Sequence, residues 1–219
     1  MSLTLDFSGD YTIWDLPEQV TLTHKRRDTA GGSWAWNVST ALRLPVSLKE
    51  AAISNGAYTT RDVVWKLPNN LVDAAPKPGD LIVAEKEPKI KWTALDVSYS
   101  PLHKTYKLTC RALAIEYDLR DTATIWGPLN RQDAAAGRMP TFVPGASTAA
   151  RFQEEAGETT MERGGLRQKR RYKIYLEDEV TVGPEDQIRD QDGGIYDYVS
   201  HEAPDRIDSL MVVTAERRP

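Results

Sequence analysis

Apolar and polar residues alternate with a period of two along most of the chain, which is the pattern of half-buried β-strands. The clearest runs are residues 62–67, 80–83, 91–99, 105–115, 172–176, 187–189, 195–199 and 210–215. Turn-forming groups separate them, such as Pro68-Asn69-Asn70 and Asp192-Gly193-Gly194. Short strands divided by frequent turns predict a mostly-β protein.

One short helix is expected within an insertion. Ser47 can cap its N-terminus, and Glu50 lies three residues later, as in a capping box. Asn55-Gly56 then ends the segment. The helix therefore spans at most about two turns.

The two halves of the chain repeat the same succession of features. The matched segments are 65–67 with 172–174, 78–82 with 184–188, Trp92 with Tyr196, and 106–108 with 210–212. The offsets stay between 104 and 107 residues, and the slippage falls in loops, where insertions are tolerated. Two similar β-modules are predicted, although any two β-meanders would share some of this spacing.

We therefore expect two small β-barrel modules with a short helical insertion and an extended connector. The first module covers residues 1–118, with an N-terminal arm and the insertion at 30–55. Residues 119–150 are rich in Ala, Gly and Pro, which favours a connector, and residues 151–219 form the second module. Trp34 and Trp36 in the insertion are either core anchors or exposed docking aromatics.

The composition is that of an ordinary water-soluble protein. The 219 residues are 40% hydrophobic and 27% charged, and six Trp and nine Tyr need a core in which to pack. No run of 18 apolar residues and no basic, apolar leader is present, so neither a membrane helix nor a secretory signal is expected. The single cysteine, Cys110, excludes an internal disulfide and is expected to be a buried thiol.

No familiar catalytic motif is found. The chain lacks the G-x-S-x-G, Walker and G-x-G-x-x-G sequences, and its three histidines have no metal-binding spacing. We therefore expect no enzyme activity, no cofactor and no metal site.

Charge is unevenly distributed, although the net charge is only −4. Residues 161–173 hold six Lys or Arg and one Glu, and residues 176–192 hold seven Asp or Glu and one Arg. The candidate interface residues are Arg163, Arg167, Lys169, Arg170, Arg171, Glu177, Asp178 and Glu179. The basic segment is a solvated loop, a protein-binding element or a phosphate contact, and the adjacent opposite charges suit packing between copies of one protein.

The second half resembles the small β-barrel head–tail connector proteins of tailed phages, also called head-closure, stopper or head–tail joining proteins. The resemblance is carried by residues 172–176, by 185–188, and by the hairpin 193–199 with its Gly193-x-x-Tyr196 spacing. Residues 60–118 show a looser version of the pattern. Members of that family are usually single modules of about half this length, so an apparent tandem duplication departs from the family pattern.

The resemblance implies a structural role, in which copies form a ring that joins the portal to the tail and helps to close the DNA channel. It implies self-association, contact with portal or adaptor and tail proteins, passing contact with DNA, and no membrane. The location would be the virion, or the bacterial cytoplasm during assembly. The alternative is a tandem β-barrel binding module for nucleic acid or carbohydrate, and sugar stacking would require Trp34, Trp36 or Trp126 to be exposed.

Overall fold

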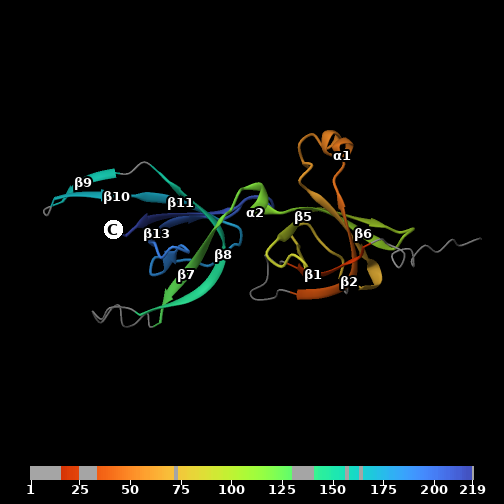
Figure 1. Cartoon of the computed structure of the whole chain (residues 1–219), viewed down its shortest axis with the longest axis horizontal. Coiled ribbons are helices and arrows are strands. Elements are labelled where there is room, and N and C mark those ends of the chain that lie inside the picture. Colours follow the sequence, from red (N-terminus) through yellow and green to blue (C-terminus); the bar gives the residue numbers. More distant parts are fainter. Residues whose placement is uncertain are drawn as a thin grey trace, which may run out of the picture. The chain divides into compact units, whose positions relative to one another are not determined.

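A computed structural model describes residues 16–24, 34–71, 74–129, 141–155, 158–162 and 165–218. The chain divides into two units, the first ending at Glu116 and the second beginning at Tyr117 (Figure 1). Each unit contains one closed β-barrel of six antiparallel strands. The predicted mostly-β fold with two barrel modules is confirmed.

The first barrel closes in the order β1-β2-β3-β6-β5-β4. Its strands are β1 (Glu18–His24), β2 (Trp34–Pro45), β3 (Val63–Pro68), β4 (Leu81–Ala84), β5 (Lys91–Ser100) and β6 (Thr105–Arg111). Between β2 and β3 the chain leaves the barrel and forms α1 (Leu48–Ile53), and a 3₁₀ turn η2 (Asn69–Leu71) follows β3. A second short helix, α2 (Leu113–Glu116), ends the unit.

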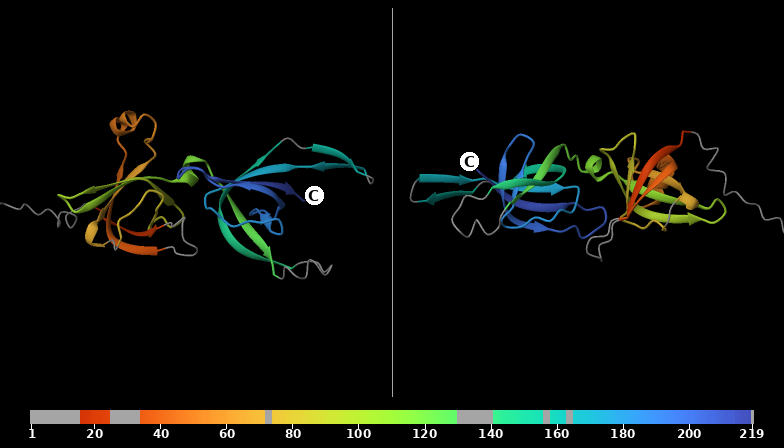
Figure 2. Two further views of the ribbon diagram at one scale, coloured as in Figure 1. Left: turned by 180° about the vertical axis from the view of Figure 1, so that it is seen from behind. Right: turned by 90° about the horizontal axis from the view of Figure 1, so that it is seen from below.

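The second barrel closes in the order β7-β8-β11-β14-β13-β12. Its strands are β7 (Asp121–Pro128), β8 (Phe142–Glu154), β11 (Arg171–Leu176), β12 (Gln187–Arg189), β13 (Ile195–Glu202) and β14 (Met211–Arg217). Between β8 and β11 the chain forms a separate two-stranded hairpin of β9 (Glu158–Glu162) and β10 (Gly165–Lys169) (Figure 2).

The two barrels have the same strand order, and local details repeat with it. In front of β4, the Asp80 carboxylate accepts a hydrogen bond from the Lys77 N–H at 2.7 Å. In front of β12, Asp186 accepts one from the Gly183 N–H at 2.8 Å, 106 residues later. In each turn the Asp N–H donates back to the carbonyl of the same partner.

A β-bulge also recurs at the corresponding place. It lies between Ala94 and Asp96 in β5 and between Tyr198 and Ser200 in β13. A bulge bends and twists its strand, and it tends to be kept as a designed feature of a fold. The sequence repeat predicted between the two halves of the chain therefore corresponds to two barrels with the same order of strands.

Each barrel encloses its own apolar core. Trp65, Leu67 and Leu108 are fully buried in the first barrel, and Ile174 and Val213 are fully buried in the second. Buried residues alternate with more exposed ones along β4, β11 and β14, as the period of two predicts, whereas β3 and β6 also bury residues of their outer face, such as Val64 and Thr109. Cys110 is fully buried in the first core, as expected, and burial raises the pKa of its thiol well above the usual value.

Residues 119–150 differ from the extended connector that their composition suggests. They supply β7 and the first part of β8, both of which are barrel strands. The inward positions of these strands include Ala123, Thr148 and Ala150, which are small but buried. Small inward residues give only a weak hydrophobic alternation. The Ala, Gly and Pro content of the segment therefore predicts a connector, although the segment forms strands.

The expected insertion at 30–55 is also smaller than its sequence suggests. β2 belongs to the barrel, and Trp36 on it is partly buried against the core. Among the described residues from 34 to 62, those at 46–62 lie outside the strands and form an arm. Within this arm the predicted helix is present with its complete Ser47–Glu50 capping box.

The strand expected over residues 105–115 stops earlier. β6 ends at Arg111, and α2 follows two residues later. Among the described residues no helix has the length and apolar character needed to cross a lipid bilayer.

Candidate assembly surfaces

The basic segment singled out by the sequence forms part of a hairpin rather than a loop. In the register of this hairpin, Arg167 lies opposite Thr160 and Lys169 lies opposite Glu158. Arg163 lies outside the described residues. Figures 1 and 2 show β9 and β10 extending away from the strands of their own barrel. The hairpin is therefore an arm of the second unit.

Basic residues at the base of this hairpin form ion pairs within the chain. Arg170 lies 3.8 Å from Glu154, and Lys173 lies 2.8 Å from Glu155, where the nearby carboxylate raises the pKa of the lysine. These side chains are about half exposed, so each pair contributes little to stability. Part of the positive charge is thus balanced inside the subunit.

A third pair at the start of β11 joins Arg171 to Glu216 of β14. The Arg171 Nη2 and the Glu216 Oε1 are 3.4 Å apart, and the two residues are direct partners across the strands. Arg171 is about half exposed, so its guanidinium stays accessible from solvent.

The acidic candidates lie directly after β11. The Asp178 carboxylate accepts a hydrogen bond from the buried Thr148 hydroxyl at 2.8 Å, and the Asp178 N–H donates to the same oxygen at 3.1 Å. The Glu177 N–H donates to the carbonyl of Ala149. Glu179 is exposed. Asp178 is therefore hydrogen-bonded to the middle of β8, and Glu179 is the most accessible of these three acids.

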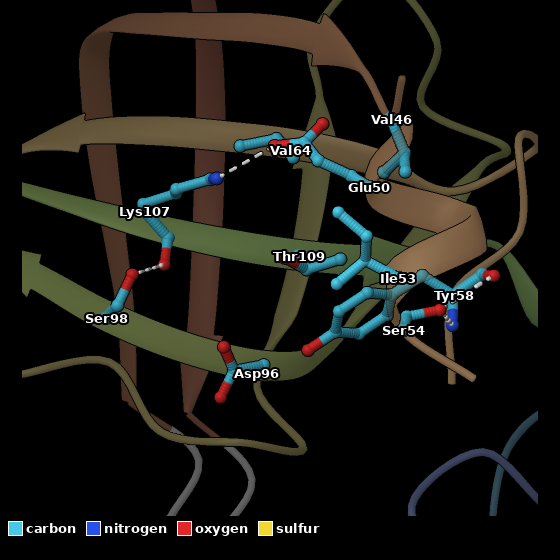
Figure 3. Close-up of a pocket in the computed structure, with 10 residues that line it drawn as sticks. All are labelled: Val46, Glu50, Ile53, Ser54, Tyr58, Val64, Asp96, Ser98, Lys107 and Thr109. Carbon is cyan, nitrogen blue, oxygen red and sulfur yellow. Dashed lines mark hydrogen bonds and ion pairs between the residues drawn. The ribbon is translucent and has the colours of Figure 1, made fainter. Parts of the chain in front are cut away.

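A pocket lies beneath α1, between the arm at 46–62 and the outer face of the first barrel, and no sequence motif predicts it. It has a volume of about 260 Å³ (Figure 3). Its lining residues are Val46, Glu50, Ile53, Ser54, Tyr58, Val64, Asp96, Ser98, Lys107 and Thr109. The Lys107 ammonium lies 3.4 Å from the Glu50 carboxylate at the rim. Such a pocket needs residues from four separate elements, and no local motif marks it.

The Glu50 carboxylate also completes the capping box. It accepts from the Ser47 N–H at 3.1 Å, and this hydrogen bond is the largest cause of the lowered pKa of Glu50. The helix itself buries none of its side chains. Leu48 and Ile53 are 80% and 69% exposed, so α1 presents apolar surface to its surroundings.

The described residues contain no group of three or more His, Cys, Asp or Glu side chains arranged to hold a metal ion. The His24 Nδ1 lies 2.6 Å from the buried Asp80 carboxylate, and its ring meets the edge of Trp36. His201 on β13 contacts the Tyr198 hydroxyl at 2.8 Å. Each of these two histidines therefore has a local structural partner.

Two of the tryptophans considered for sugar stacking, Trp36 and Trp126, are partly covered. The Arg189 guanidinium lies 3.8 Å from the ring centroid of Trp126, and Trp36 packs against the first core. Trp34 begins β2. A stacked arginine occupies the face that a sugar ring would need.

No protein-family model matches the chain, and no curated protein matches it. Among the solved structures, one similar chain comes from a structure described as "Virion of native gene transfer agent (GTA) particle". The similarity covers 43% of this chain and 90% of that chain, with 13% sequence identity and a TM-score of 0.36. A TM-score this low assigns neither a shared fold nor a shared function.

Proposed function

We propose that this chain is a structural subunit of the head–tail connector class of tailed phages or prophages, and that copies of it associate into a ring. The role is one of assembly rather than catalysis. Its partners are further copies of the chain, a portal or adaptor protein, and tail proteins. It acts in the virion, or in the bacterial cytoplasm while particles are assembled.

The observation that carries this proposal is the arm found at the same point of both barrels. In the first barrel the β2–β3 connection carries α1, and in the second the corresponding β8–β11 connection carries the β9–β10 hairpin. Each arm extends beyond a closed barrel, in which every strand pairs with a neighbour on both sides. Arms of this kind are available for contact with a neighbouring molecule.

A ring requires that a projection on one subunit meets a different surface on the next. A barrel with an arm supplies both parts of such a head-to-tail contact. The exposed apolar residues of α1 and the basic residues of the hairpin provide the chemistry for it. The sequence resemblance of the second half to connector proteins supports the same role.

Electron microscopy of the purified full-length chain, alone and mixed with a portal ring, tests the proposal. We expect closed rings, formed alone or on the portal. A protein that stays monomeric and binds neither the portal nor the neighbouring tail proteins would contradict the proposal. Binding to DNA that weakens steeply with salt, without any ring, would favour the tandem binding module instead.

A further inference from the structure

The pocket beneath α1 combines apolar walls with the exposed carboxylate of Asp96. Val46 and Val64 are buried at its base, and Ile53 and Tyr58 close its sides (Figure 3). At about 260 Å³ the pocket is smaller than the sites that hold drug-sized molecules, and it suits one long side chain.

The charges around the pocket favour a cation. Glu50 is balanced by Lys107, whereas within the described part of the chain the exposed Asp96 side chain has no basic partner. In Figure 3 the Asp96 carboxylate lies near the Tyr58 hydroxyl. Burial and the negative charges of Asp96 and Asp62 raise the pKa of Tyr58, so its phenol stays neutral and the charge beside the aromatic wall is that of the Asp96 carboxylate.

An arginine or lysine side chain fits this combination. Its aliphatic stem can pack on Ile53 and Tyr58 while its charged head reaches a carboxylate. The helix above the pocket has only six residues and buries none of them. Helices this short are marginal without tertiary contacts, so α1 gains stability from an occupant that packs against it.

The chain itself contains a concentrated source of such side chains. Residues 161–173 hold six Lys or Arg, and Arg167 and Lys169 belong to β10 of the projecting hairpin. We propose that the β9–β10 hairpin of a second copy docks at α1 and inserts one of its basic side chains into the pocket beside Asp96. This inference rests on the proposed self-association and names the contact that produces it.

Cross-linking between two populations of the full-length chain tests the contact. One population carries Ile53→Cys and a large tag, and the other carries Gln168→Cys and a small tag. Cys110 is buried, so it does not compete for oxidation. We expect mixed disulfide dimers of the two sizes. The control replaces Gln168→Cys with Asp192→Cys, because Asp192 is exposed on another hairpin.

Charge reversal provides a second measurement on the same contact. We expect Asp96→Lys to weaken self-association about tenfold or more, and Arg167→Glu with Lys169→Glu to do the same. Combining all three changes restores part of the association. Asp192→Lys, a matched change of an exposed acid, leaves it unchanged.

The results separate this inference from the proposed function. Rings that form normally with Asp96→Lys, and mixed dimers no more frequent than in the control, would overturn the docking contact and leave the connector role standing. A chain that never associates, with or without a portal, would overturn both.

Discussion

The two barrels place an ion pair at the same position, with the charges exchanged. In the first barrel the acid, Asp62, precedes β3 and the base, Arg111, ends β6. In the second barrel the base, Arg171, begins β11 and the acid, Glu216, lies opposite it on β14. The acid thus lies at the first strand of the pair in one barrel (β3 with β6) and at the second strand in the other (β11 with β14).

Burial distinguishes the two pairs. Asp62 and Arg111 are 1% and 8% exposed, and they form two hydrogen bonds of 2.9 and 2.8 Å. The arm completes this site, because Arg111 also donates to the Ala57 carbonyl and Asp62 accepts from the Thr59 N–H. The second pair has one contact of 3.4 Å at the surface. The arm of the first barrel therefore converts a surface pair into a buried one.

Removing one member of the buried pair has the largest expected effect. Asp62→Ala leaves the Arg111 guanidinium buried without its partner, and we expect the first barrel to lose about 3–5 kcal/mol of stability. Labelling of Cys110 measures this loss, because the only thiol of the chain is buried in that barrel. Labelling should become much faster in the variant, and an unchanged rate would contradict the account.

Removing Asp190 should destabilise the β12–β13 hairpin of the second barrel. Its carboxylate accepts hydrogen bonds from the Gly194 N–H at 2.6 Å and from the Tyr196 hydroxyl at 2.9 Å. We expect Asp190→Ala to cost about 2–3 kcal/mol, since these two donors and the Asp192 N–H, which donates at 3.0 Å, lose their acceptor. Hydrogen exchange should rise in residues 187–202.

The corresponding β4–β5 hairpin serves as the internal control for Asp190→Ala. Its turn is held by backbone hydrogen bonds, such as that from the Glu87 N–H to the Ala84 carbonyl. Exchange in residues 81–100 should therefore stay unchanged. Equal increases in both hairpins would show that the two barrels do not behave as separate units.

The second barrel should also lose stability at alkaline pH. Burial, followed by the hydrogen bond to Asp190, raises the pKa of Tyr196 above the usual value of 10. The folded state therefore holds this proton more tightly than the unfolded chain. The stabilisation from the protonated Tyr196 hydroxyl is therefore fully present below pH 10. It is lost as the pH rises from 10 through the higher pKa of the folded state. Unfolding followed by hydrogen exchange at increasing pH should show the loss, and Tyr196→Phe should reduce it.

Removing the exposed pair of the second barrel has the smallest expected effect. Arg171→Ala should cost about 0–1 kcal/mol, because solvent screens a half-exposed pair. Equilibrium unfolding in urea measures the change for the second barrel. If Arg171→Ala cost the second barrel as much stability as Asp62→Ala costs the first, burial would not explain why the two ion pairs differ in strength.

The elements that could be predicted from the sequence are those with large inward residues or with capping groups at their ends. β3 and β5 carry the large buried residues Trp65 and Trp92, β11 alternates strictly around Ile174, and α1 has both members of its capping box. The small inward residues of β7 and β8 provided no comparable pattern. Their strand character depends on closing the second barrel, which is a long-range property.

The candidate surfaces were predicted only in part. A run of like charges identified the basic segment, but its pairing as a hairpin depends on β9, which has no distinctive alternation. The pocket beneath α1 joins residues 46–64 with residues 96–109. Contacts over such distances follow from the order of strands in the barrel, which the local sequence pattern does not specify.

The mass of the purified full-length chain in solution tests the structural role most directly. Native mass spectrometry over a range of concentrations, with and without a portal ring, would count the copies in each particle. We expect one closed species with a fixed number of copies, formed alone or on the portal. A 24.5 kDa monomer at every concentration, unchanged by the portal, would contradict it.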